Sequence, residues 1–408
     1  MITLPPENKA IYVEPAMYNL PTKHVRECDV NCVWTRDWNI TTLKYASDAF
    51  ISDPYPILNK TFPHPKYCPH QRTLLFTAEN LDKNEFEPKF DINIYSRSDG
   101  DAHVGYFGYQ LLEKPIKKKK DDVLISAYIS NCFYRVSSDR LRIIKELRKY
   151  IKIDVFGKCF NKKEPEEFNH LGFANRKIEN IGRYKFHLAF ENSKDEGYIS
   201  EKIWQSFYAG TVPIYLGAPN IRKFLPRQNA ALIVDEFPSI EALANEIKRI
   251  GSNEIEYQRM FEWRKKVDDS FLNVMDYECL RNSCKICHKV ADILDQKRIT
   301  KLHSKRFHLY IRPLNMYRYK IIYPKQPITL QSLLDQLYEM FKDYQPRWQY
   351  CIMKHFRKYH DIHNFRVKIS KIIKSNWGFK QKILDDGIDS DQKIKKLKSG
   401  EKLEVIFV

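Results

Sequence analysis

The chain has 408 residues, of which 43% are hydrophobic and 29% are charged, and its formal net charge is +18. This apolar content is enough for two or three folded domains and excludes a mainly disordered chain. No run reaches the roughly twenty apolar residues that span a bilayer, and residues 1–20 lack a signal-peptide pattern, so the chain as given is expected to be soluble.

The N-terminal stretch differs from the rest of the chain in composition and in the periodicity of its apolar residues. Residues 1–70 are rich in Pro, Asn, Asp and aromatic residues with little periodicity, which predicts loops and short strands. From Arg72 onward, short apolar runs alternate with amphipathic stretches, and this alternation indicates βαβ units. Strands are predicted at 73–76, 123–125 and 153–156, and a helix is predicted at 140–150.

Two stretches suggest domain boundaries. Residues 114–122 are rich in Lys, contain Pro115 and lack an apolar anchor, which predicts a solvated linker. A second boundary is predicted near 297–305, after an expected helix at 278–296. The three predicted domains are therefore residues 1–118, 119–300 and 301–408.

The C-terminal segment is predicted to be a small α+β module. Its expected elements are strands at 307–312 and 316–323, a helix at 330–341 and a last strand at 401–408, for which a β-grasp arrangement is one candidate. Residues 301–408 hold 23 Lys and Arg against 10 Asp and Glu, a net charge of +13 that leaves +5 for the rest of the chain. A basic face can bind nucleic acid or an anionic membrane, but Lys-rich faces are usually only solvated, so no nucleic-acid partner is expected.

Nine cysteines and two glycosylation sequons, at Asn39 and Asn59, suit an oxidising lumen. Structural disulfides are the preferred interpretation. The disulfide candidates are Cys28, Cys32, Cys279, Cys284 and Cys287. A zinc site that uses the last three with His288 is an alternative, but a second half-site is missing. Free, buried cysteines are a third interpretation.

The segment 184–226 is predicted to form a strand, a loop, a helix and a second strand. Both strands, at 185–190 and 212–216, are apolar, and the helix is expected at 200–208. In an open parallel sheet, ligands bind at the carboxyl ends of strands, where helix N-termini direct backbone N–H groups at anions. The polar residues that cluster at this end are Glu191, Asn192, Tyr198, Glu201 and Lys202.

Lys202 lies in the first helical turn, where the helix dipole disfavours a cation. An anionic ligand would compensate for this, so Lys202 is expected to neutralise a pyrophosphate. Glu201 would then hold sugar or ribose hydroxyls, and Tyr198 would pack on the base or the sugar. The alternative is that Glu201 and Lys202 only decorate a surface helix that Ser200 caps.

These residues resemble the donor-binding motif of the α1,3-fucosyltransferase family, glycosyltransferase family ten. The matching stretches are Phe190-Glu-Asn-Ser193, Gly197-Tyr-Ile-Ser-Glu-Lys202 and Ala209-Gly-Thr-Val-Pro-Ile-Tyr-Leu-Gly-Ala-Pro219. Ile129-Ser-Asn-Cys132, Arg140 and residues 152–157 are also similar to the family. Val104 to Gly108, the close cysteine pairs and the final strand resemble the plant core-fucosylating branch, glycoprotein 3-α-L-fucosyltransferase.

The resemblance implies an α/β fold of GT-B type, with two Rossmann-like domains that face a cleft. Residues 1–118 would form the acceptor side, and residues 119–300 would bind GDP-fucose. The implied reaction is inverting transfer of L-fucose in α1,3 linkage to N-acetylglucosamine, preferably in the core of N-glycans on glycoproteins. Golgi residence is implied too, with membrane attachment only through an anchor that this chain does not contain.

The resemblance also implies roles for single residues. Phe76-Thr-Ala-Glu-Asn80 is similar to a motif that carries the general base, so Glu79 is expected to take the acceptor proton, although Glu191 is a rival for a catalytic role. Arg140 and Lys202 would stabilise the leaving diphosphate. The expected GDP-fucose ligands are Asn131, Arg140, Glu191, Asn192, Tyr198, Glu201 and Lys202.

No metal is expected to be required, because two cations would neutralise the diphosphate, and a divalent ion would at most stimulate. Asp99-Gly-Asp101 is similar to the metal motif of another glycosyltransferase fold, but the family places it away from the diphosphate. Lewis-type or protein acceptors, a different nucleotide sugar, and a non-catalytic carbohydrate- or nucleic-acid-binding protein are the alternatives to this function.

Overall fold

A computed structural model describes most of the middle of the chain and shorter stretches near both ends. The longer described stretches are 71–79, 89–107 without 98, 115–132, 138–160, 162–268 and 282–302, and strands are described within 11–52 and 309–407. The chain divides into two compact units. The first consists of residues 1–104, 280–346 and 362–408, and the second of residues 105–279 and 347–361. The three domains divided at 118 and 300 remain a prediction.

The second unit is built on a five-stranded parallel sheet in the order β12-β11-β10-β8-β9. Its strands are β8 (Ile125–Tyr128), β9 (Ile153–Phe156), β10 (Phe186–Phe190), β11 (Val212–Leu216) and β12 (Leu232–Ile233). Every residue of β9, β10 and β11 is buried, as expected for a parallel sheet with both faces covered. The strands predicted at 153–156 and 212–216 are confirmed.

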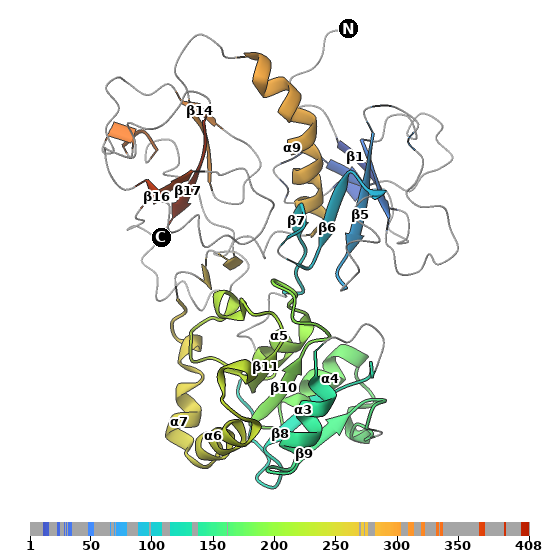
Figure 1. The fold of residues 1–408 in the computed structure, drawn as a ribbon, viewed down its shortest axis with the longest axis vertical. Helices are drawn as coiled ribbons and strands as arrows, with labels where there is room; N and C mark the ends of the chain where they lie inside the picture. The colour runs from blue at the N-terminus through green and yellow to red at the C-terminus, as the bar shows by residue number, and fades with distance from the viewer. Residues whose placement is uncertain are drawn as a thin grey trace. The chain divides into compact units, whose positions relative to one another are not determined.

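Helices surround this sheet in the second unit (Figure 1). They are α3 (Arg140–Leu147), α4 (Phe173–Ile181), α5 (Glu201–Tyr208), α6 (Ile240–Ser252) and α7 (Glu254–Arg259). Ile144 of α3 and Leu243 of α6 are both fully buried in the same core as the strands, which fixes these helices to the sheet through apolar contact. The side chain of Ser239 caps α6 by accepting a hydrogen bond from the backbone N–H of Ala242 at 3.0 Å.

The Lys-rich stretch before β8 is exposed over most of its length, but it lies inside the second unit and is partly anchored, so the prediction of a linker between units is wrong. The Nζ of Lys119 donates to the carbonyl oxygens of Gly182 at 2.8 Å and Gly210 at 2.6 Å. These carbonyls lie just after α4 and α5, where helices leave C=O groups unpaired and favour a cation. Burial lowers the pKa of Lys119 to about 7, and Arg264 and Lys117 contribute to this lowering. A lysine in a run of charged residues can therefore attach its segment to the fold when the carbonyl oxygens at helix ends accept its hydrogen bonds.

The first unit contains a seven-stranded sheet in the order β2-β3-β1-β4-β5-β6-β7. Its strands are β1 (Ile11–Pro15), β2 (Lys23–His24), β3 (Cys32–Trp34), β4 (Ala49–Ser52), β5 (Arg72–Thr77), β6 (Ile92–Tyr95) and β7 (Ala102–His103). All neighbours are parallel except β2 and β3, which pair antiparallel. The N-terminal region thus contributes short strands, as predicted, and both units have the α/β character expected.

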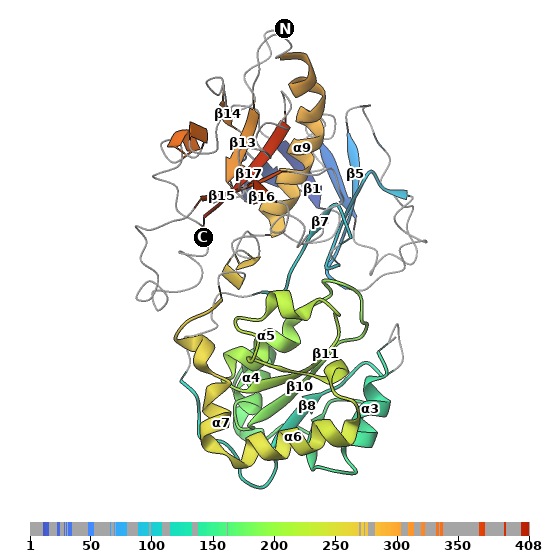
Figure 2. The same cartoon turned by 60° about the vertical axis from the view of Figure 1, so that its left-hand side comes forward.

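Helix α9 (Asn282–Leu302) packs on this sheet beside β1 and β7 (Figures 1 and 2). Ile286 and Val290 of the helix are fully buried in one core with Leu74 and Ile94 of the strands. The helix was expected at 278–296 and begins at Asn282. No helix in the described part of the chain is both long and apolar enough to cross a membrane.

Two disulfides, Cys28–Cys284 and Cys32–Cys287, tie the N-terminal sheet to α9. This pairing contradicts the zinc alternative: Sγ of Cys284 lies 3.3 Å from Nε2 of His288, but it is already bonded to another sulfur. Cys279 lies outside the described residues, as do both sequons. A third disulfide, Cys132–Cys159, was not predicted.

The C-terminal strands form a separate five-stranded sheet in the order β14-β13-β17-β15-β16 (Figure 2). The strands are β13 (Leu309–Pro313), β14 (Lys320–Ile322), β15 (Val367–Lys371), β16 (Gly387–Ile388) and β17 (Glu401–Phe407). The first and last strands are parallel neighbours in the middle, and β14 and β15 pair antiparallel on either side. Leu333 and Leu337, which lie in helical backbone, are fully buried. This is the strand order of a β-grasp module, the arrangement considered from the sequence.

Candidate functional site

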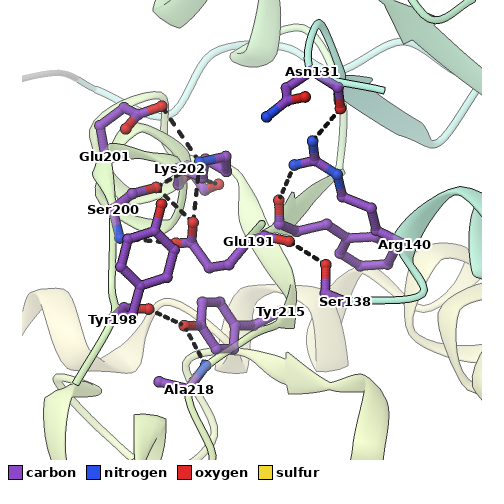
Figure 3. A network of polar contacts seen from close by, with 12 residues as sticks. Asn131, Ser138, Arg140, Glu191, Tyr198, Ser200, Glu201, Lys202, Tyr215 and Ala218 are labelled. Atoms are coloured by element: carbon purple, nitrogen blue, oxygen red, sulfur yellow. Dashed lines mark hydrogen bonds and ion pairs between the residues drawn. The ribbon is translucent and has the colours of Figure 1, made fainter. Parts of the chain in front are cut away.

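Polar residues gather where β8 and β10 end and α5 begins. Asn131 follows β8, Glu191 and Asn192 follow β10, and Ser200 immediately precedes α5. The carboxyl ends of parallel strands meet at one edge of a sheet, and the N-terminus of a helix at that edge directs partial positive charge outward. Figure 3 shows Asn131, Glu191 and Ser200 converging from separate elements.

Glu191 is the centre of the network. Its side chain is fully buried, and its carboxylate accepts hydrogen bonds from the backbone N–H of Ser200 at 2.8 Å and from the Ser200 hydroxyl at 2.7 Å. Nζ of Lys202 lies 3.0 Å from the same carboxylate. Glu191 therefore ties the end of β10 to the first turn of α5. Its predicted direct contact with a donor stays a prediction.

This arrangement explains how a lysine is tolerated in the first turn of α5. The sequence suggested that an anionic ligand would compensate for its position, and the structure supplies a protein carboxylate that does so. Burial alone would lower the pKa of Lys202, but Glu191 and Glu201 outweigh burial and raise it. Lys202 is therefore a fixed, protonated cation whose side chain is 15% exposed.

Lys177 on α4 is a further cation of the site that sequence reasoning missed. Its Nζ lies 3.8 Å from Oε1 of Glu201, and that same oxygen lies 3.7 Å from Nζ of Lys202. Burial opposes the charge of Glu201, but the two lysines lower its pKa. Lys177 lies four residues before the buried Ile181 and therefore on the same face of α4. A lysine on the apolar face of a helix is the sequence feature that could have identified it as a site residue.

Arg140, the first residue of α3, is 2% exposed. Its Nη1 donates to the carbonyl oxygen of Phe190 at 3.3 Å, and its Nη2 donates to the carbonyl oxygen of Asn131. Nε of Arg140 has no hydrogen-bond partner among the described residues. Burial lowers the pKa of Arg140, whereas Glu191 and Tyr198 raise it. Glu191 lies between Arg140 and Lys202 (Figure 3), so two cations flank one buried carboxylate.

The other predicted ligands join the site through backbone or packing. Tyr198 is 1% exposed. Its backbone carbonyl oxygen lies 3.5 Å from the hydroxyl of Tyr215. Tyr198 is therefore buried in this structure, and its predicted contact with the base or the sugar stays a prediction. The carbonyl oxygen of Asn192 accepts a hydrogen bond from the backbone N–H of Ser138 at 3.1 Å, which ties β10 to the start of α3.

Glu79 lies at the carboxyl end of β5 in the first unit and is exposed. Its backbone N–H donates to Oγ1 of Thr77 at 3.2 Å. Its role as a base stays a prediction. Asp99 pairs with Arg97 at 3.0 Å, and Asp101 pairs with Lys289 at 3.3 Å, so both carboxylates of the suspected metal motif already neutralise protein cations.

Replacing Glu191 with glutamine is expected to lower the free energy of unfolding by about 1.5–3 kcal/mol, because Lys202 loses a charged hydrogen-bond partner in a buried site. Urea denaturation measures this change. Asp235→Asn is the matched control: its carboxylate is 51% exposed and pairs with the exposed Lys194, and the expected change is below about 1 kcal/mol. Equal effects of the two variants would show that Glu191 is not the centre of the network.

The comparison with protein-family models bears mainly on the second unit. Residues 116–305 match the family model described as glycosyltransferase family 10 (fucosyltransferase), C-terminal. A fucosyltransferase-like protein of Arabidopsis thaliana is 28% identical over 271 residues, which are 62% of this chain and 51% of that protein. GDP-fucose protein O-fucosyltransferase 3 of Xenopus laevis is 40% identical over 130 residues, 31% of this chain and 28% of that protein.

The alignments thus span about half of the plant relative and less than a third of the frog relative. Among solved structures, a crystal structure of α1,3-fucosyltransferase with GDP-fucose aligns with a TM-score of 0.42 and 16% identity. That alignment covers 64% of this chain and 84% of the crystallised one.

Proposed function

We propose, from the match of residues 116–305 to the glycosyltransferase family 10 model, that the protein transfers fucose from GDP-fucose to an acceptor hydroxyl with inversion. The observation that carries the proposal is the buried junction of Glu191 with Ser200 and Lys202 at the start of α5, with Arg140 beside it. Two fixed cations, one at the N-terminus of α3 and one at the N-terminus of α5, suit a diphosphate, which is the charged part of a nucleotide sugar.

In this proposal, the two cations act on the leaving group. As the bond between fucose and the diphosphate breaks, negative charge grows on the diphosphate oxygens, and Lys202 and Arg140 stabilise it without having to reorganise. Glu201, held by Lys177 and Lys202, is oriented to accept hydrogen bonds from ribose or fucose hydroxyls. Glu79 removes the proton of the acceptor hydroxyl. We also propose that no metal is required, because these cations neutralise the charge that a metal would.

For the acceptor, we propose the core N-acetylglucosamine of N-glycans, fucosylated in α1,3 linkage. This rests on the resemblance of Val104 to Gly108 and of the cysteine pairs to the plant branch. A protein hydroxyl is the second candidate, favoured by the identity of 40% with a protein O-fucosyltransferase over 130 residues. The disulfides among the described residues support an oxidising compartment such as the Golgi lumen.

The test is a matrix of donors and acceptors. The protein is incubated with GDP-fucose, GDP-mannose or UDP-N-acetylglucosamine, each with an N-glycopeptide or with a folded, unglycosylated protein domain. Mass spectrometry should show one added deoxyhexose on the glycopeptide with GDP-fucose alone, and glycosidase sensitivity reports the linkage. Addition to the unglycosylated domain would select the protein acceptor. Use of another donor with indifference to GDP-fucose would refute the proposed function.

A further inference from the structure

The loops that follow β8 and β9 are held together by a disulfide, a backbone hydrogen bond and a close approach at a glycine. The disulfide Cys132–Cys159 links them with a Cα–Cα distance of 5.7 Å. The backbone N–H of Cys159 donates to the carbonyl oxygen of Ile129 at 3.1 Å. Gly157 has a φ of +98°, and a Cβ added there would meet the carbonyl oxygen of Ile129 at 2.6 Å. Only glycine allows such a close approach, so the two loops are built to lie against each other.

This joined pair of loops holds one end of the Arg140 guanidinium. The carbonyl oxygen that accepts from Nη2 of Arg140 belongs to Asn131, the residue directly before Cys132. Nη1 is held separately by the carbonyl oxygen of Phe190 at the end of β10. The guanidinium therefore spans two loops, and its direction depends on where the Asn131 carbonyl is fixed.

The three disulfides among the described residues differ in the length of chain that each one closes into a loop. Cys28–Cys284 and Cys32–Cys287 join residues 256 and 255 positions apart, which constrains the chain as a whole. Cys132–Cys159 joins residues only 27 positions apart. The segment between them contains α3, the helix that begins with Arg140. The Cys132–Cys159 disulfide therefore constrains a segment of the candidate site.

We propose that the Cys132–Cys159 disulfide is a positioning element for Arg140: it fixes the Asn131 carbonyl and so holds the guanidinium toward the diphosphate. This inference rests on the proposed function. Without the disulfide, the loop after β8 gains freedom, and Arg140 loses a fixed acceptor. The loss should appear as weaker binding of a nucleoside diphosphate, beyond any loss of stability.

A double-mutant cycle tests this inference, with the GDP dissociation constant measured by calorimetry on the full chain. The four proteins are the parent, Cys132→Ser with Cys159→Ser, Arg140→Met, and the triple variant. In the parent background, loss of the disulfide should weaken GDP binding roughly tenfold to a hundredfold, which is the effect of losing one hydrogen bond between charged groups. In the Arg140→Met background, the same loss should change GDP binding by less than about twofold, because the residue it positions is gone.

Equal weakening in both backgrounds would overturn the inference, because a purely structural disulfide gives additive effects. Circular dichroism and thermal unfolding confirm that each variant is folded. If the serine pair does not fold, Cys132→Val with Cys159→Ala replaces it and is judged by the same cycle. A parent protein that binds no GDP would refute the proposed function together with this inference, whereas GDP binding with additive losses would refute only the inference.

Discussion

Replacing Glu79 with glutamine is expected to lower kcat by roughly 10²- to 10⁴-fold, the usual contribution of a general base. Glutamine has nearly the same shape but cannot accept the proton of the acceptor hydroxyl. Glu79 lies at the exposed carboxyl end of β5, and glutamine keeps its shape there, so the substitution should not unfold the protein. Affinity for GDP should stay unchanged, because the predicted donor ligands lie in the second unit.

Asp99→Asn is the matched control for Glu79. Asp99 is another exposed carboxylate of the first unit, and it pairs with Arg97. Its loss should leave kcat within about twofold of the parent value, since exposed ion pairs contribute little. Initial rates at saturating GDP-fucose measure both variants. Unchanged turnover of the Glu79 variant would remove this residue from the mechanism. A large loss of kcat in the Asp99 variant would instead favour a role for Asp99 in binding a metal.

Replacing Lys202 with methionine is expected to lower kcat/KM for GDP-fucose by roughly 10²- to 10³-fold, as the loss of a fixed charge-stabilising donor does. Lys202 is held by Glu191 at 3.0 Å and by the Ser200 hydroxyl at 2.7 Å, so its charge is in place before the reaction begins. Methionine fills a similar volume but leaves Glu191 without its cation. A fall in thermal stability should therefore accompany the kinetic loss.

Lys194→Met is the control for Lys202. Lys194 lies in the same segment between β10 and α5, but it pairs with Asp235 at 2.7 Å and is 41% exposed. Its loss should change kcat/KM by less than about threefold. Thermal unfolding, followed by assays well below the midpoint of each variant, separates lost stabilisation of charge from lost fold. Equal kinetic losses in the two lysine variants would show that Lys202 has no special role.

The parts of the fold that sequence predicted well are the buried strands. The runs at 153–156 and 212–216 are largely apolar, which suits a parallel sheet covered on both faces, and β9 and β11 occupy these same residues. The Lys-rich stretch at 114–122 was predicted to be a solvated linker because a run of charged residues is normally solvent-exposed. Its acceptors, the carbonyl oxygens of Gly182 and Gly210, become available only when two helices end side by side.

Sequence by itself determined the kinds of residue in the site and the element that presents them. Glu191, Ser200 and Lys202 were all expected near one strand end and one helix start, because strand and helix signals are local. Tertiary structure decided which side chains meet. It made Glu191 the buried partner of Lys202, brought in Lys177 from α4 and joined Cys132 to Cys159. These contacts depend on which elements become neighbours when the sheet and its helices pack, and no local pattern specifies that choice.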